Sequence, residues 1–395
     1  MKYKKNISKL HTKQILIVLI TALFIVVTFN ILTVSFLKTK ENIATAQMIP
    51  GWGRQYKPIM HDILKPEAVA FGASWVRDAF DPILSENLIG FTFFNHGISG
   101  GTSYETKRFV QSAISSSTMK HAYLNVESFY DAPEGSKKQY GFDENNLLIK
   151  QNGEPNVFVR LNRFKNLYTS GASINFNFQL IKARIKLMNG ESIKTISPSF
   201  QSINWTQHRS KLKEITKDIF SPNGPTTINQ SIKTPTFNDL KETVTILCGK
   251  NINVHVYETP HHSIFKGCNN KYNHTNYLRI QLEALKPQCG SNLTYHSFLY
   301  PNAITLDGID SNKNSSIFFR PDGHPTPYLG LEMLKKIHNI KSDSTSNLID
   351  FGTNLMDLSL DQTRNWIDRR KGRCQGNWSK EDLIVLGMDK DKLDN

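Results

Sequence analysis

The chain has 395 residues, of which 39% are hydrophobic and 21% are charged, and this composition excludes a disordered protein. The formal net charge of +14 is not gathered in a nucleic-acid-binding patch, because beyond the N-terminus the densest basic run is only DRRKGR at 368–373. We therefore expect no nucleic-acid partner. An acidic polysaccharide or a membrane surface fits the charge better, and a solvated basic surface is its simplest explanation.

The first 37 residues have the pattern of a membrane anchor. Residues 1–14 form a basic tail with five lysines and no acid, and residues 15–37 contain no charged side chain. At about 1.5 Å per residue, such a helix crosses a hydrocarbon core of roughly 30 Å. The run is longer than the roughly 7–15 apolar residues of a signal peptide, although IATAQ at 43–47 keeps a cleaved signal peptide as the alternative. The lysines predict a cytoplasmic N-terminus and a main domain outside the membrane, in the bacterial periplasm or at the cell exterior.

Beyond a juxtamembrane linker at 38–60, apolar strand-like runs alternate with segments of helical spacing. The strand candidates are 68–72, 89–94, 121–127, 252–258 and 294–300, and the helical candidates are 103–117, 236–250, 276–286 and 326–340. Such alternation is typical of a parallel sheet with helices on both faces. The sequence therefore predicts an α/β domain over 61–340, a three-layer sandwich around a mostly parallel five-stranded sheet.

An insertion at about 132–235 interrupts this alternation. Because ligands bind at loops beyond the carboxyl ends of strands in such folds, we interpret the insertion as a cap or lid over a site. A structural flap or an assembly surface is the alternative. Residues 341–395 are expected to form a C-terminal linker and a helix.

The four cysteines, Cys248, Cys268, Cys289 and Cys374, contain no C-x-x-C pair, so a zinc ribbon and thioredoxin-like chemistry are not indicated. In an exported domain they can form one or two disulfides, and separate buried thiols are the equally weighted alternative.

Candidate catalytic residues follow different strands. Ser74 ends FGAS directly after the first strand, the glycine-rich stretch NHGISGGTS at 95–103 follows the second, and PDGHP at 321–325 precedes a late helix. Acyl transfer through serine requires a nucleophile, a histidine base, a group that orients this histidine, and N–H donors for the oxyanion. The pair His261–His262 follows another strand and is expected near the same cleft, but without a spaced third ligand it does not predict a metal site.

These three stretches, in this order, resemble the sequence blocks of the SGNH (GDSL-like) hydrolases over residues 65–340. The resemblance implies that Ser74 is the nucleophile, that His324 is the base with Asp322 as its partner, and that Gly100 supplies an oxyanion N–H. It implies no cofactor and no metal. Four further residues are candidates for oxyanion or substrate binding: Gly101, Asn95, Glu127 and Arg77. For Arg77, recognition of a sugar carboxylate and a plain surface ion pair both stay open.

Two positions depart from the pattern of that family. Its third block commonly reads G-x-N-D, whereas the corresponding strand end here reads LNVES and places Glu127 on or near the asparagine position. An ionised carboxylate does not donate a hydrogen bond to an oxyanion. Asp322 and His324 also follow D-x-H spacing instead of D-x-x-H. This shorter spacing occurs in the membrane-linked polysaccharide O-acetylation branch of the family, which the chain resembles in its anchor as well.

Two functions from different classes follow from these residues. The first is a membrane-anchored extracytoplasmic serine esterase or acyltransferase that acts on O-acyl groups, most plausibly acetyl, of a cell-envelope polysaccharide. The second is a catalytically inactive SGNH-like domain that binds glycan or serves as a scaffold in envelope assembly. A phospholipase or thioesterase acting beside the bilayer is a third reading. The sequence does not separate hydrolysis from transfer, because that difference lies in whether water or a hydroxyl acceptor occupies the site.

Overall fold

The computed structural model describes residues 2–36, 39–47, 53–116, 118–130, 139, 141–169, 171–189, 203–204, 206, 210, 234–262, 272–299, 302, 304–306, 315–341 and 351–374. The longer helices and the short ones used below are α1 (Lys2–Phe36), α2 (Lys40–Gln47), α3 (Gly53–Leu64), α4 (Ser74–Ala79), α5 (Pro82–Ile89), α6 (Ser103–Ile114), α7 (Glu127–Tyr130), α8 (Val159–Phe164), α9 (Gly171–Met188), α12 (Thr234–Cys248), α14 (Tyr272–Glu283), α15 (Lys286–Cys289), α16 (Pro327–Ile337) and α17 (Leu360–Cys374).

The main domain is α/β and contains a mixed, mostly parallel sheet, as predicted. Its six strands are β1 (Ala68–Phe71), β2 (Phe93–Asn95), β3 (His121–Asn125), β5 (Asn253–Glu258), β6 (Leu293–Ser297) and β8 (Thr353–Asn354), in the order β2-β1-β3-β5-β6-β8. All neighbouring pairs are parallel except β6 and β8. The prediction of five strands was therefore one short. The missing edge strand has only two residues, too few to produce an apolar pattern, and lies in the expected C-terminal linker.

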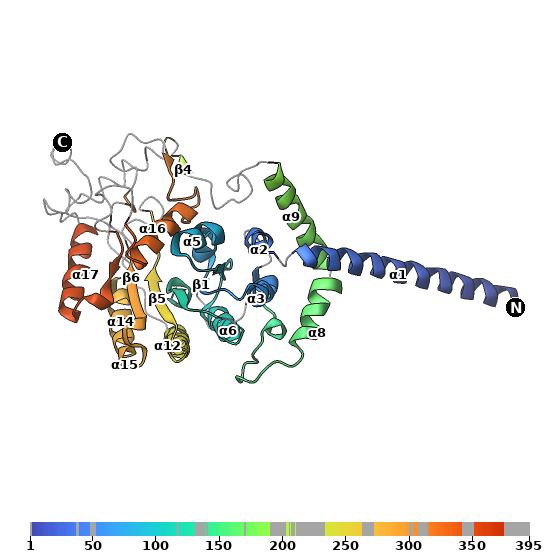
Figure 1. Cartoon of the computed structure of the whole chain (residues 1–395), viewed down its shortest axis with the longest axis horizontal. Helices are drawn as coiled ribbons and strands as arrows, with labels where there is room; N and C mark the ends of the chain where they lie inside the picture. The colour runs from blue at the N-terminus through green and yellow to red at the C-terminus, as the bar shows by residue number, and fades with distance from the viewer. Residues whose placement is uncertain are drawn as a thin grey trace.

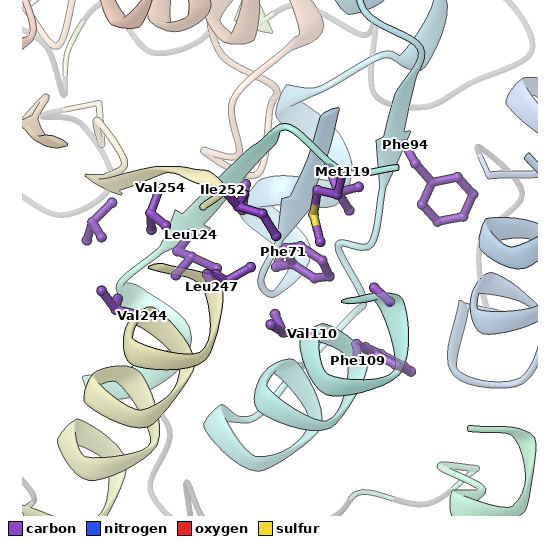
Figure 2. Packing of buried hydrophobic residues seen from close by; sticks show 14 of the residues in the cluster. Phe71, Phe94, Phe109, Val110, Met119, Leu124, Val244, Leu247, Ile252 and Val254 are labelled. Atoms are coloured by element: carbon purple, nitrogen blue, oxygen red, sulfur yellow. The ribbon is translucent and has the colours of Figure 1, made fainter. Parts of the chain in front are cut away.

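Each face of the sheet has its own buried cluster, because alternate strand residues point to opposite sides. Val69 and Phe71 belong to one cluster, and Ala68 and Ala70 belong to the other. Figure 2 shows Phe71 in the first cluster, near side chains of β3, β5, α6 and α12. The second cluster includes side chains of α4 and α16. Strands buried on both sides explain why the sequence shows continuous apolar runs.

The N-terminal helix α1 extends away from the rest of the molecule (Figure 1). Its segment His11–Leu32 is long and apolar enough to cross a membrane. The following residues, expected as a linker, instead contribute helices α2 and α3 to the domain. Ile43 of α2 and Tyr56 of α3 are each 1% exposed and belong to the main core.

One described part of the insertion lies against the domain end of α1. Helices α8 and α9 flank α1 there (Figure 1), and between them Lys165–Thr169 form a π-helix. Asn30 of α1 donates hydrogen bonds to the carbonyl of Tyr168 and to Ser173 Oγ, both at 2.9 Å. Another part of the insertion, β4 (Ile203–Asn204), pairs with β7 (Ser315–Ser316), the strand that precedes His324 in the chain. Most of 190–233 lies outside the described residues, and the cap over the site stays a prediction.

A disulfide joins Cys248 at the end of α12 to Cys289 at the end of α15. Of the two alternatives for the cysteines, the structure thus contains a disulfide for this pair. Cys268 lies outside the described residues, and Cys374 ends α17.

Candidate active site

Ser74 is the first residue of α4 and follows the carboxyl end of β1 after the turn Gly72–Ala73. The next strand in the sheet, β2, ends beside it, and the loop after β2 packs against the start of α4. A Cβ atom on Gly97 would lie 2.1 Å from the backbone nitrogen of Arg77. Only glycine, which has no Cβ atom, avoids this clash. The glycine in this loop is therefore required for the close approach of two segments that the sheet brings together.

His324 lies within hydrogen-bonding distance of the serine. Its Nε2 atom is 3.0 Å from Ser74 Oγ, although 250 residues separate the two in the chain. The histidine belongs to a tight loop between β7 and α16, in which the backbone nitrogen of Arg320 donates to the carbonyl of His324 at 2.8 Å. The ring of Trp75 stacks on the imidazole with ring centroids 4.6 Å apart. The structure thus brings the predicted nucleophile and the predicted base into contact.

Asp322 lies beside the other nitrogen of the same imidazole. Its Oδ1 is 3.3 Å from His324 Nδ1, the distance of an ion pair without the alignment of a hydrogen bond, and it also accepts from the backbone nitrogen of His324 at 3.2 Å. Arg320 Nη2 contacts the second carboxylate oxygen at 3.1 Å. Despite the D-x-H spacing, the carboxylate of Asp322 therefore lies beside the imidazole nitrogen of His324 that does not contact Ser74.

Arg77 and Asp78 connect the serine helix to the histidine loop. Arg77 forms a bidentate pair with Asp78, at 2.7 and 2.9 Å, and also contacts Ser99 Oγ. Asp78 is 2% exposed and accepts a further hydrogen bond from Arg320 Nη1 at 2.6 Å. In this arrangement the guanidinium of Arg77 forms an ion pair with a buried carboxylate, whereas the sequence suggested a surface ion pair; recognition of a sugar carboxylate by Arg77 stays a prediction.

The predicted residues of the glycine-rich loop differ in their access to solvent. Gly100 is exposed and has a left-handed φ of +58°. A Cβ atom on Gly101 would lie 3.3 Å from the Cα of Ala73, so this loop borders the serine turn. Asn95, in contrast, is 2% exposed, and its Nδ2 donates to the carbonyls of Val76, Arg77 and Phe80. Substrate binding by Asn95 is therefore not supported, because its amide holds α4 in place.

Lys57 holds the loop that follows β2 through two hydrogen bonds. This residue of α3 is 3% exposed, and its Nζ donates to the carbonyls of Asn95 at 2.7 Å and Gly97 at 2.6 Å. Burial, reinforced by the charge of Arg77, lowers the pKa of Lys57 to about 7, and the opposite charge of Asp78 offsets only part of this shift. The lysine thus fixes two carbonyls of the loop that passes Ser74.

Glu127 forms a second buried pair next to the serine–histidine contact. One carboxylate oxygen lies 2.6 Å from His261 Nε2, and the other accepts from Asn125 Nδ2 at 3.2 Å. The edge of Trp75 meets the ring of His261 with centroids 4.2 Å apart, so the same indole contacts both His261 and His324. Glu127 is 3% exposed, and both of its oxygens are engaged within the protein.

Comparison with known proteins adds no relative. No family model, curated protein or solved structure matches this chain. The site itself contains a hydroxyl, an imidazole in contact with it and a carboxylate beside that imidazole. Such a set is capable of nucleophilic attack with general-base assistance.

Four residues of this site were not predicted from the sequence: Trp75, Asp78, Arg320 and Lys57. Trp75, Asp78 and Arg320 lie close in sequence to predicted residues, and Lys57 lies in the segment expected as a linker. The contacts that give these residues a role are made to distant segments. Arg320 stands two residues before Asp322, and Asp78 follows Arg77 directly. The sequence signal for Asp78 and Arg320 was therefore a charged residue close to a candidate site residue of opposite charge.

Proposed function

We propose that this chain is a membrane-anchored serine esterase or O-acyltransferase that acts on O-acyl groups, most plausibly acetyl, of a cell-envelope polysaccharide. The observation that carries the proposal is the 3.0 Å contact between Ser74 Oγ and His324 Nε2. An SGNH-like three-layer fold is part of the proposal, and the mostly parallel sheet with a buried cluster on each face supports it.

In the proposed mechanism Ser74 Oγ attacks the ester carbonyl while His324 Nε2 takes the hydroxyl proton. Asp322 stabilises the imidazolium that results, and the amides of Ser74 and Gly100 hold the oxyanion. Collapse of the tetrahedral intermediate breaks the bond to the sugar oxygen, which receives the proton from His324. Water or an acceptor hydroxyl then attacks the acyl-serine, again with His324 as base. The substrate class is inferred from the resemblance and from the anchor, and the choice of acceptor is left open by these residues.

The proposed location is outside the membrane, with the N-terminus in the cytoplasm and α1 as the anchor. The Cys248–Cys289 disulfide supports it, since disulfides persist in oxidising compartments. Helices α8 and α9, beside the end of α1, expose large apolar side chains at 50–79%, among them Leu161, Phe164, Phe178 and Met188. They also carry Arg160, Lys182 and Lys186. We place these two helices at the membrane surface, where apolar and basic side chains both find partners.

The test uses the full chain in detergent and 4-nitrophenyl acetate as the ester. We expect turnover in the unchanged protein, its loss in both Ser74→Ala and His324→Ala, and labelling of Ser74 by a fluorophosphonate. Ser115→Ala, an exposed serine at the end of α6, is the matched control and should keep full turnover. Absence of both turnover and labelling in the unchanged protein would refute the proposal.

The glycan-binding or scaffold function is the second candidate. Glu127 favours it, because a buried carboxylate paired with His261 occupies the position where the resemblance implies an oxyanion-donating asparagine. Binding of an acetylated polysaccharide by an unlabelled, inactive protein would support this candidate. Labelling without turnover would instead point to a transferase that lacks its acceptor.

A further inference from the structure

Three histidines gather toward the amino-terminal ends of two central strands, at the end of the sheet opposite to the candidate active site. His121 begins β3, whereas Glu127 follows the end of the same strand. His255 lies on the neighbouring strand β5, where it pairs in register with Tyr123. His338 is the residue that ends α16. The three side chains thus come from segments that the topology of the fold brings together.

The spacing of their nitrogen atoms fits a metal ion. One ligand atom from each histidine lies within 4.8 Å of those of the other two, and His121 Nδ1 is 3.1 Å from His255 Nε2. Zinc–nitrogen bonds of about 2.0–2.1 Å in a tetrahedral site place ligand atoms about 3.3 Å apart. The first two histidines therefore already have the required separation. The third, His338, is half-buried at the end of α16, and its ligand atom lies within 4.8 Å of the other two.

A hydrogen bond orients one of these imidazoles toward its neighbour. His255 Nδ1 lies 2.9 Å from Thr294 Oγ1, which directs Nε2 toward His121. Hydrogen bonds of this kind to the remote nitrogen are typical of metal-binding histidines.

The nearby charges do not prevent cation binding. The ammonium group of Lys120, next to His121, is paired with Glu67 at 2.7 Å. Tyr123 OH lies 2.6 Å from His338 Nε2 and provides a polar partner at the same place. His121 and His338 are both partly exposed, which gives an ion a route from solvent.

We propose that His121, His255 and His338 bind one divalent transition-metal ion, with Zn²⁺ as the best-fitting member of the class. Three imidazoles leave a fourth position for water. Because the site joins β3 and β5 to α16, the ion clamps the helix that follows the His324 loop. The proposal is independent of the esterase function, since the three histidines lie toward the amino-terminal ends of the strands, whereas Ser74 follows the carboxyl end of β1.

The experiment is a calorimetric titration of ZnCl₂ into the full chain in detergent, after treatment with EDTA and gel filtration. We expect one ion per chain and a rise in Tm on addition of stoichiometric Zn²⁺. His338→Gln should weaken Zn²⁺ binding by about tenfold or more. Loss of a residue that only hydrogen-bonds a metal ligand already costs about that much affinity, and loss of a ligand should cost at least as much. His324→Ala should bind as the unchanged chain does, which excludes the candidate active site as the binding place.

A second variant guards against misfolding. His121→Gln should also weaken binding, and circular dichroism of both variants should match that of the unchanged protein. If one of them fails to fold, the other decides the outcome. Co²⁺ offers an independent readout, because a tetrahedral site gives strong visible absorption that both variants should lose. Stoichiometric binding that survives in a folded His338→Gln or His121→Gln protein, or no binding in the unchanged chain, would overturn the proposal.

Discussion

Arg320 Nη1 donates a hydrogen bond to Asp78 Oδ2 at 2.6 Å, and this contact ties the loop of the histidine to the helix of the serine. The same guanidinium reaches Asp322 through Nη2 at 3.1 Å. Arg320 thereby connects the carboxylate of Asp322, the proposed partner of His324, to the buried carboxylate of Asp78, which Arg77 also holds. This network therefore forms a second connection, besides their direct contact, between the segments that carry Ser74 and His324.

Replacing Arg320 by Gln should lower kcat for ester hydrolysis by about tenfold while KM changes little. The substitution releases the histidine loop from Asp78 and leaves a buried carboxylate with one partner fewer, which also costs about 1–3 kcal/mol of stability. Steady-state kinetics on 4-nitrophenyl acetate and urea denaturation measure the two effects. Arg364→Gln, which removes an exposed pair with Asp361, is the control and should change neither. Unaltered kcat in Arg320→Gln would contradict a positioning role.

Gly330→Ala should push α16, which follows the His324 loop, away from α4, which begins with Ser74. A Cβ atom at this position of α16 would lie 1.7 Å from the carbonyl oxygen of Ala79, the last residue of α4. Overpacking of this kind costs about 1–3 kcal/mol, and the displaced histidine loop should lower turnover as well. The matched control is Gly249→Ala, whose Cβ would be 3.3 Å from the nearest atom, the carbonyl oxygen of Thr245. Equal Tm values for the two variants would show that α16 adapts without cost.

Lys57 gives stability a distinct dependence on pH. Its pKa is about 7 in the folded protein and 10.5 in the unfolded chain, so between these values the unfolded chain binds more protons. The free energy of unfolding therefore rises with pH through this window, by roughly 1.4 kcal/mol per pH unit when the difference is one proton. The contribution of Lys57 should become more favourable by about 2 kcal/mol from pH 7 to pH 9.

The measurement compares the unchanged protein with Lys57→Met, which cannot titrate, at several pH values by chemical denaturation. Lys150→Met removes an exposed lysine and should follow the unchanged protein at every pH. A difference between the unchanged protein and Lys57→Met that is constant over pH 7–9 would show that Lys57 keeps its ordinary pKa.

The Cys248–Cys289 disulfide should stabilise the domain by about 4 kcal/mol, because it closes a separation of 41 residues in the unfolded chain. The double variant Cys248→Ala/Cys289→Ala should show this loss in guanidinium denaturation. Reaction of a thiol reagent with both cysteines in the denatured, unreduced chain would mean that the pair is not bonded.

The sequence predicted the parts of the fold that depend on local pattern. The runs around Val69, Ala122 and Val254 are continuous because both sides of each strand are buried, and all three form strands. Ser74 and His324 were predicted as a catalytic pair from the order of three sequence blocks, and the structure brings their side chains into contact. Edge strand β8 was missed because a two-residue strand has no periodicity.

Long-range polar contacts were beyond the reach of the sequence. Asp78 and Arg320 are 242 residues apart, and the identity of a charged residue does not indicate which residue of opposite charge it contacts. Asn95 was placed among the binding residues because it opens a recognisable stretch, but its burial depends on how α4 folds back over it. His121, His255 and His338 have no motif spacing, so only the register of β3 and β5 and the end of α16 reveal the cluster.

The 250 residues between Ser74 and His324 also have a consequence for the life of the molecule. Ribosomes add about 5–20 residues per second, so the nucleophile is made roughly 12–50 s before its base. During that interval the emerging chain has a serine with no partner to take its proton. The contact that carries the proposed esterase function therefore forms only after the His324 loop and α16 have been made and have packed against α4. On that proposal, a nascent chain that ends before residue 324 has no activity toward esters.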